Sequence, residues 1–310
     1  MQVLRVEKPG LLTTIQDLGR LGAIASGVPP GGAVDRFAHQ AANLLAGNEP
    51  GAATLECTLS GPQLVAERDC VIAIAGADLD PRINGSEMPM WTAVGLGEGD
   101  RVSFGGRRLG ARAYIAVAGG FDGERWLGSR STSVIAGRGG LAGRPLKAGD
   151  VLSTAGAISV RLAGRELNRL QRPDYTDHHL AAMPGPHLRR LAADDRRLLF
   201  TASFIVSSAS DRMGCRLDGA TLATSGEELL SYGLVAGAVQ VPHSGQPILL
   251  LADHQTAGGY PAVAAVVSAS LPTAAQLVPG DELQFVETTA LQARRRREAL
   301  SSALSSLAAR

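Results

Sequence analysis

The chain has 310 residues, of which 45% are hydrophobic and 19% charged, and its 30 basic and 29 acidic residues leave a formal charge of +1. This balance argues against a nucleic-acid groove or an anionic membrane surface as the main partner. The 38 glycines and the 4% of aromatic residues predict many tight turns, and therefore a β-rich or loop-rich fold in place of a helical bundle.

Short strands closed by tight turns follow one another along the chain. The Asn84-Gly85 pair predicts a two-residue hairpin, and Gly-Asp turns at 99–100, 149–150 and 280–281 each open a strand. The other expected strands are 71–75 (ending at Gly76), 114–118, 158–162, 238–241, 248–252 and 262–267. Many short strands with turns between them predict a mainly β fold of barrels or sandwiches.

Three helices are expected. The first runs from Asp35 to Ala46 and ends at Gly47, because its apolar residues share one face. The second covers about 193–200, and the third is the C-terminal tail, which Thr288 or Thr289 can cap. The arginine run 294–297 is interpreted as the solvated side of that last helix, not as a nucleic-acid patch.

The least periodic stretch, between about 164 and 184, is expected to separate the domains. We predict an N-terminal β unit over 1–165, a C-terminal β-barrel over 180–290, and a C-terminal helix or tail over 291–310. The N-terminus has no signal-peptide pattern and no run approaches 18 apolar residues, so no membrane association is expected. The odd number of cysteines (Cys57, Cys70 and Cys215) predicts buried free thiols in a reducing cytoplasm.

Several common site motifs are absent. The two lysines, Lys8 and Lys147, have neither a phosphate-loop nor a biotin-acceptor context, so no biotin is expected on this chain. The segment Gly137–Ala142 is a near match to a dinucleotide fingerprint, but Pro145 follows where a helix should begin. The six histidines show no ligand spacing, and no metal site is predicted.

Three segments carry more Gly, Pro and polar residues than loops need. In the first, Gln16, Asp17 and Arg20 precede the run 27–35, and the favoured interpretation is structural, with Asp17 paired to Arg20 and Asp35 capping a helix. In the second, Asp211 and Arg212 follow a strand. Arg212 offers a planar fork for a carboxylate or phosphate, and a local Asp–Arg pair is equally consistent with the pattern.

The third segment, 239–261, brackets a short apolar strand with two Gly/Pro loops. Asp253 is its candidate general base or metal ligand, and Gln240, Gln246 and Gln255 could bind an amide or urea-like group. The structural alternative is a set of hairpin turns in which Asp253 caps backbone amides.

These segments together resemble one family. The runs QDLGR, GVPPGGAVD, VAGGFDG and LGSRST in the first half, and SDRMGCRL, GAVQVP and LADHQTAGGYP in the second, are similar to those of the biotin-dependent carboxyltransferase-like family. This family includes the C subunit of ATP-dependent 5-oxoprolinase, also called allophanate hydrolase subunit 2, and a region of the urea carboxylase carboxyltransferase domain. The similarity runs from about residue 3 to 287.

The resemblance implies tandem cyclophilin-like β-barrel units with a few short helices, and a heteromeric complex with homologues of the B and A subunits of 5-oxoprolinase. It implies that Asp253, Arg212 and Asp211 line a pocket, and we interpret these three residues as catalytic. Arg212 would hold the substrate carboxylate, and Asp253 would polarise or deprotonate a bound group. A small amide substrate would contact further residues: Gln240, Gln255, Thr256, Gly259, Tyr260, Gln16, Asp17, Arg20 and Asp35. ATP would act at the level of the complex.

Three functions remain open at this point. The chain could be the C subunit of a 5-oxoprolinase that opens 5-oxoproline to L-glutamate. It could be a carboxyltransferase component that acts on urea or a related amide with biotin from another protein. It could also be a non-enzymatic regulator that binds a homologue of the B subunit. Both 5-oxoproline and urea offer an amide carbonyl and N–H, so the sequence does not separate them.

Overall fold

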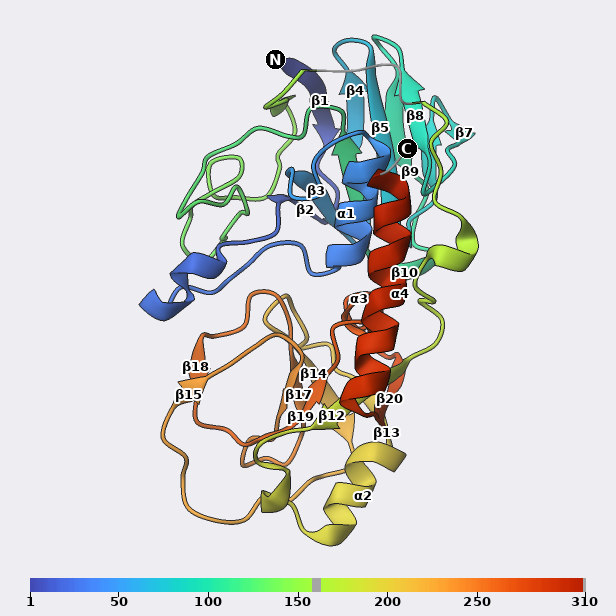
Figure 1. Cartoon of the computed structure of the whole chain (residues 1–310). Coiled ribbons are helices and arrows are strands. Elements are labelled where there is room, and N and C mark those ends of the chain that lie inside the picture. Colours follow the sequence, from blue (N-terminus) through green and yellow to red (C-terminus); the bar gives the residue numbers. More distant parts are fainter. Residues whose placement is uncertain (158–162, 309–310) are drawn as a thin grey trace. The chain divides into compact units, whose positions relative to one another are not determined.

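The computed structural model describes residues 1–157 and 163–308, which divide into two compact units (Figure 1). Of these residues, unit 1 comprises 1–20, 31–157, 163–172 and 300–308, and unit 2 comprises 21–30 and 173–299. The mainly β fold is confirmed. The strand expected over 158–162 lies outside the described residues, and no helix among those described is long and apolar enough to cross a membrane.

Unit 1 contains two β-sheets and one main helix. The six-stranded sheet has the order β11-β1-β4-β9-β6-β7, and the five-stranded sheet has the order β2-β3-β10-β5-β8. The elements are β1 (Gln2–Lys8), β2 (Leu12–Gln16), α1 (Arg36–Leu45), β3 (Thr54–Thr58), β4 (Gln63–Ala66), β5 (Cys70–Asp78), β6 (Pro81–Ile83), β7 (Ser86–Glu87), β8 (Ala93–Leu96), β9 (Arg101–Phe104), β10 (Leu109–Val117), β11 (Val151–Ser153) and the short 3-10 helix η2 (Arg169–Gln171).

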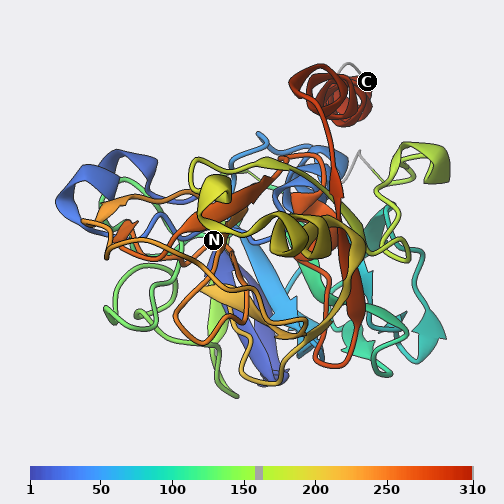
Figure 2. The same cartoon turned by 90° about the horizontal axis from the view of Figure 1, so that it is seen from below.

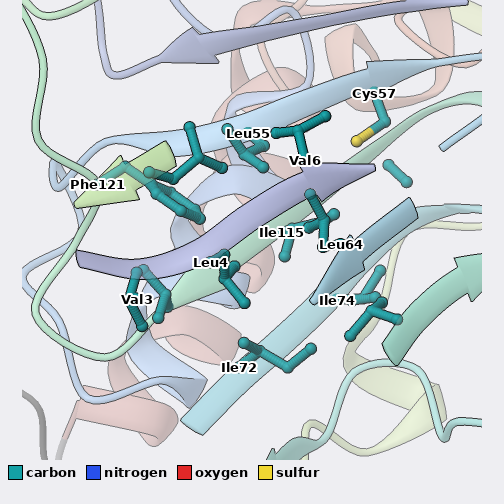
Figure 3. Packing of buried hydrophobic residues seen from close by; sticks show 14 of the residues in the cluster. Val3, Leu4, Val6, Leu55, Cys57, Leu64, Ile72, Ile74, Ile115 and Phe121 are labelled. Carbon is teal, nitrogen blue, oxygen red and sulfur yellow. The ribbon is translucent and has the colours of Figure 1, made fainter. Parts of the chain in front are cut away.

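The core of unit 1 is formed by apolar side chains from both sheets (Figure 3). Val3 and Leu4 of β1, Leu55 of β3 and Ile72 of β5 are all fully buried in it. Helix α1 packs on β5 and β10, so these central strands are buried on both faces. Residues 70–77 of β5 therefore form a continuous apolar run without a polar alternation.

Strand β5 is longer than the sequence predicts. It continues through Gly76 to Asp78 and pairs with β10, whose register shifts between Leu109 and Ala113. Gly76 adopts a φ of +95°, and a Cβ there would lie 2.4 Å from the Arg112 carbonyl oxygen. The strand can pass this close to its neighbour because the residue has no side chain.

Unit 2 contains a closed barrel with the strand order β12-β19-β16-β17-β14-β13-β20, beside a two-stranded sheet of β15 and β18. Phe204 and Phe285 meet in the barrel interior with ring centroids 5.8 Å apart. The elements are η1 (Leu21–Ser26), β12 (His179–Pro184), η3 (Leu188–Arg190), α2 (Ala193–Thr201), β13 (Ser203–Val206), β14 (Gly214–Gly219), β15 (Tyr232–Gly233), β16 (Ala238–Gln240), β17 (Ile248–Leu250), β18 (Ala257–Gly258), β19 (Ala262–Val266), α3 (Leu271–Ala274) and β20 (Glu282–Glu287).

The C-terminal helix α4 (Ala290–Ala308) is confirmed, and Figure 2 views it almost end-on. The Thr289 hydroxyl accepts the backbone N–H of Gln292 at 3.3 Å, so this threonine is its cap. Ala303 and Leu307 are its buried residues, whereas the run 294–297 is exposed. The arginine run is thus on the solvated side of the helix.

The three Gly-Asp turns have the same backbone conformation and the same side-chain hydrogen bond. Gly99, Gly149 and Gly280 adopt φ values of +89°, +88° and +92°. In each turn the aspartate carboxylate accepts the backbone N–H of the residue three positions earlier, at 2.7, 2.7 and 2.9 Å. These local contacts explain why the turns and the strands after them could be predicted.

Candidate functional site

A chain of hydrogen-bonded amides lies at the end of β16 in unit 2. Gln240 is 1% exposed, and its Nε2 donates to the Tyr260 carbonyl oxygen at 3.1 Å. The Tyr232 hydroxyl donates to the same oxygen at 2.5 Å. Gln255 donates from its Nε2 to the Gln240 Oε1 at 3.3 Å.

This chain of contacts fixes the orientation of both glutamines. The Tyr260 carbonyl can only accept, so Gln240 must present its NH₂ group to that oxygen and its Oε1 to Gln255. Gln255 must then present its own NH₂ group to Gln240. The Gln255 Oε1 has no hydrogen-bond partner among the described residues and remains an available acceptor.

The two loops at this end of the barrel are joined by an ion pair. Arg212 donates from Nε and Nη2 to the two carboxylate oxygens of Asp253, at 2.9 and 3.2 Å. The Asp253 N–H also donates to the Arg212 carbonyl at 2.9 Å. The Arg212 side chain is 13% exposed and the Asp253 side chain is 28% exposed. The two hydrogen bonds of the guanidinium fork hold the Asp253 carboxylate in one orientation.

Asp211 has a different environment. It is exposed, and its Oδ1 accepts the backbone N–H groups of Met213 at 2.8 Å and Gly214 at 3.3 Å. This side-chain turn directs the chain into β14.

A cavity of about 440 Å³ opens beside these groups in unit 2. Asp211, Gln240, Gln255 and Tyr260 line it, but Arg212, Asp253, Thr256 and Gly259 are not among its lining residues. The lining residues are Ser207, Ala209, Asp211, Met213, Gly214, Arg216, Leu217, Asp218, Gln240, Pro242, Ser244, Gln246, Pro247, Ile248, Leu250, Gln255 and Tyr260.

A second, smaller cavity of about 210 Å³ shares Tyr260 with the first and is also lined by Gly259 and His243. Thr256 lies in the same loop, where its carbonyl accepts the Leu234 N–H at 2.9 Å. The loop 253–261 thus contributes to both cavities and to the amide chain.

The charged residues that sequence reasoning missed are Arg216 and Asp218. Both lie on β14, and both line the larger cavity. The sequence does contain a signal for them: the charged residues alternate with the buried apolar residues Cys215 and Leu217 along the strand. This alternation places both charged side chains on the same face of the strand.

The other four candidates lie in unit 1. Burial by itself would raise the pKa of Asp17, but four hydrogen bonds lower it below the ordinary value. They come from the hydroxyls of Ser129 and Ser131, both at 2.6 Å, and from the N–H groups of Gly19 at 2.8 Å and Arg130 at 2.6 Å. Asp17 therefore joins the loop around residue 130 to the end of β2.

Arg20 and Gln16 are buried near the same loop. The Arg20 guanidinium lies 4.8 Å from the centroid of the Trp126 ring and donates to the Ser131 carbonyl. The Gln16 Nε2 donates to the Thr132 carbonyl at 3.3 Å, whereas its buried Oε1 has no partner among the described residues. Gln16 thus retains a free acceptor.

Asp35 is the N-cap of α1, as predicted, and accepts the Ala38 N–H at 2.9 Å. Its own N–H donates to the Tyr114 hydroxyl at 2.8 Å, and that hydroxyl donates to Glu56 at 2.7 Å. Burial raises the pKa of Tyr114 well above its usual range. This buried network fixes the end of the glycine- and proline-rich run 27–35 against the sheet.

No group of three or more His, Cys, Asp or Glu side chains in residues 1–157 and 163–308 is placed to hold a metal ion. All three cysteines are free and buried, as expected.

Comparison with known proteins gives three findings. Residues 26–287 match the family described as "Carboxyltransferase domain, subdomain A and B". The C subunit of 5-oxoprolinase from Escherichia coli is 36% identical over 299 residues, which cover 96% of this chain and 94% of the relative. The crystal structure of the K. lactis urea amidolyase matches with a TM-score of 0.91 at 29% identity; the match covers 98% of this chain but 20% of that one.

Proposed function

Since this chain belongs to the family of carboxyltransferase domains, subdomain A and B, we propose that it is the C subunit of a 5-oxoprolinase. The observation that carries the proposal is the near full-length match to the C subunit of the Escherichia coli 5-oxoprolinase. The chain accounts for 94% of that relative but for a fifth of the urea amidolyase chain. The match therefore spans nearly the whole of the separate 5-oxoprolinase component, but only one region of the urea amidolyase.

The reaction adds water across the C–N bond of the lactam of 5-oxoproline. The ring nitrogen becomes the amine of L-glutamate and the carbonyl carbon becomes its side-chain carboxylate, while a second water cleaves ATP to ADP and phosphate. We assign the lactam N–H to the Gln255 Oε1, because Gln255 lines the cavity and its Nε2 is already bound to Gln240, which leaves Oε1 as the acceptor. Gln240 is then a positioning residue that acts through Gln255.

Asp253 is our candidate for the group that polarises or deprotonates a bound group, with Arg212 holding its carboxylate in place. Thr256, Gly259 and Tyr260 lie in the same loop as Asp253. The contributions of Gln16, Asp17, Arg20 and Asp35 to substrate binding, and of Asp211 to catalysis, remain predictions.

We place the ATP site on the other components of the complex. Lys8 ends β1, and Lys147 precedes a Gly-Asp turn, so neither lysine follows a glycine-rich phosphate loop. The partners would be homologues of the B and A subunits. The buried free thiols fit a reducing compartment such as the cytoplasm.

The first test is ATP-dependent release of glutamate from 5-oxoproline by this chain co-expressed with the homologues of the B and A subunits, and again with each omitted. Activity that requires all three would support the proposal. A well-formed complex that releases no glutamate would refute it.

Two variants test the residue assignments. Asp253→Asn should abolish glutamate release but leave co-purification with the B subunit unchanged, whereas Asp194→Asn on the exposed side of α2 should alter neither. Unchanged turnover by the Asp253 variant would remove this residue from the mechanism. Gln255→Leu should raise KM about 10-fold, because a substrate N–H then loses its acceptor.

A second candidate function is carboxyl transfer to urea or a related amide. The similarity to the K. lactis urea amidolyase favours it, and the Gln255 acceptor also suits a urea N–H. A complex without glutamate release should then be assayed for urea-dependent ATP cleavage with a biotin carboxylase added. If both reactions fail while the B subunit still binds, the regulatory alternative gains support.

A further inference from the structure

Three strands of the unit 2 barrel place a glutamine, an isoleucine and an arginine in one row. Gln240 of β16 pairs with Ile248 of β17, and Ile248 pairs with Arg216 of β14. Residues directly opposite each other in antiparallel strands point to the same face. The adjacent row, formed by Val239, Leu249 and Cys215, faces the other way and is buried.

The spacing of this row suits a small molecule. Neighbouring strands lie about 4.8 Å apart, so the backbones at Gln240 and Arg216 are about 10 Å apart with Ile248 between them. All three residues line the larger cavity. A ligand over Ile248 can therefore reach the amide chain at one end and a guanidinium at the other.

The two arginines near this cavity differ in what they already bind. The Arg212 guanidinium donates two hydrogen bonds to Asp253. The Arg216 side chain is exposed, and it makes no hydrogen bond or ion pair with any residue that the structure describes. Its backbone is fixed, because its N–H donates to the Ser210 hydroxyl at 3.0 Å and its carbonyl accepts the Ser207 N–H at 2.9 Å.

We propose that Arg216 binds the carboxylate of the substrate, and so selects a lactam that carries a carboxylate over a neutral amide. This inference rests on the proposed function and deepens it. A guanidinium with no partner among the described residues is free to form the two parallel hydrogen bonds that a carboxylate accepts.

The other charges of the cavity reinforce the selection. Asp211 and Asp218 also line it, so two carboxylates would face an anionic substrate if Arg216 were removed. Loss of Arg216 should therefore weaken binding of an anionic lactam by more than the lost hydrogen bonds alone. Binding of a neutral lactam should not suffer this penalty.

The test compares 5-oxoproline with 2-pyrrolidone, the same ring without its carboxylate. We expect Arg216→Gln to raise KM for 5-oxoproline about 10- to 100-fold in the reconstituted complex, with kcat less affected, and Arg216→Lys to recover part of the loss. Arg197→Gln, on the exposed side of α2, is the matched control and should change nothing.

Ligand-observed NMR of the same proteins gives a readout independent of turnover. The wild-type complex should bind 5-oxoproline more tightly than 2-pyrrolidone, and Arg216→Gln should remove that difference. Equal affinity of both proteins for 5-oxoproline would overturn the assignment of Arg216 and leave the proposed function intact. A wild-type complex that neither binds nor hydrolyses 5-oxoproline would overturn both.

Discussion

Helix α1 carries a buried histidine whose protonation should destabilise unit 1. His39 is fully buried, and its Nδ1 lies 2.9 Å from the Thr54 hydroxyl. Burial lowers the pKa of His39 from 6.5 to about 4, although Asp17 and Glu56 act in the opposite direction. The imidazole is therefore neutral in the folded protein at pH 7 and must stay neutral to remain buried.

The sign of the pH effect follows from linkage. Between pH 6.5 and 4 the unfolded chain binds a proton at His39 that the folded chain does not bind, so the free energy of unfolding falls as the pH falls. A depression of the pKa from 6.5 to about 4 corresponds to a total loss of about 3 kcal/mol, of which about 2 kcal/mol is lost by pH 5. The loss is complete below pH 4 and absent above pH 6.5.

Tryptophan fluorescence during urea unfolding measures this effect locally. The chain has two tryptophans, Trp91 and Trp126, and both belong to unit 1. Trp91 packs on Phe37 of α1 with ring centroids 6.3 Å apart, so its signal follows the helix that carries His39. The free energy of unfolding should be compared at pH 7 and pH 5.

His39→Asn is the informative variant, because an amide can replace the contact to Thr54 and does not titrate. In this variant the decrease in the free energy of unfolding from pH 7 to pH 5 should be about 2 kcal/mol smaller than in the wild type, whatever the stability of the variant at pH 7. The exposed His243→Asn should keep the slope of the wild type. The same steep slope in His39→Asn would show that another group causes it and would refute the argument.

Three further outcomes are expected. Tyr114→Phe should lower the free energy of unfolding of unit 1 by about 2–3 kcal/mol, measured by the same fluorescence, because a buried carboxylate loses a hydroxyl donor. Gly258→Ala should reduce kcat/KM for 5-oxoproline, because the added Cβ would lie 3.0 Å from Leu234 and 3.5 Å from the Gln240 amide. Gly233→Ala should leave kcat/KM unchanged, because no atom lies within 4 Å of the Cβ that it adds. Iodoacetamide at pH 8 should alkylate none of the three cysteine thiols before the protein unfolds, because all three are buried and burial raises the pKa of Cys70 to about 12. Mass spectrometry measures the labelling, and a labelled thiol in the folded protein would contradict this prediction.

Elements whose determinants are local could be predicted from the sequence. Helix α1 begins after Asp35 and ends before Gly47 because its cap and apolar stripe lie within twelve residues. The Asn84-Gly85 hairpin forms with φ values of +51° and +84° at its two turn residues, as that dipeptide predicts. Neither feature needs information from a distant strand.

Features that depend on distant strands could not be predicted in this way. The continuation of β5 past Gly76 depends on the backbone of β10, which lies more than thirty residues later. The pairing of Arg212 with Asp253 joins two loops 41 residues apart. Sequence reasoning identified both loops as polar and proposed Arg212 for the substrate carboxylate, with a local Asp–Arg pair as the alternative. It did not identify Asp253 as the residue that pairs with Arg212.

A bulge beside Gln240 explains how the fold gives the larger cavity two different ends. Strand β19 pairs Ala264 with Val239 but Ala262 with Gln240, so Val263 is an extra residue. Tyr260, whose carbonyl orients the Gln240 amide, lies just before this bulge in the chain. The backbone register thus places the amide chain of Gln240 at one end of the row of Gln240, Ile248 and Arg216. The alternation of side chains along β14 places the Arg216 guanidinium at the other end. A neutral amide such as urea would use only the first end, whereas a carboxylated lactam would use both, so the proposed role of Arg216 predicts tighter binding of 5-oxoproline than of urea.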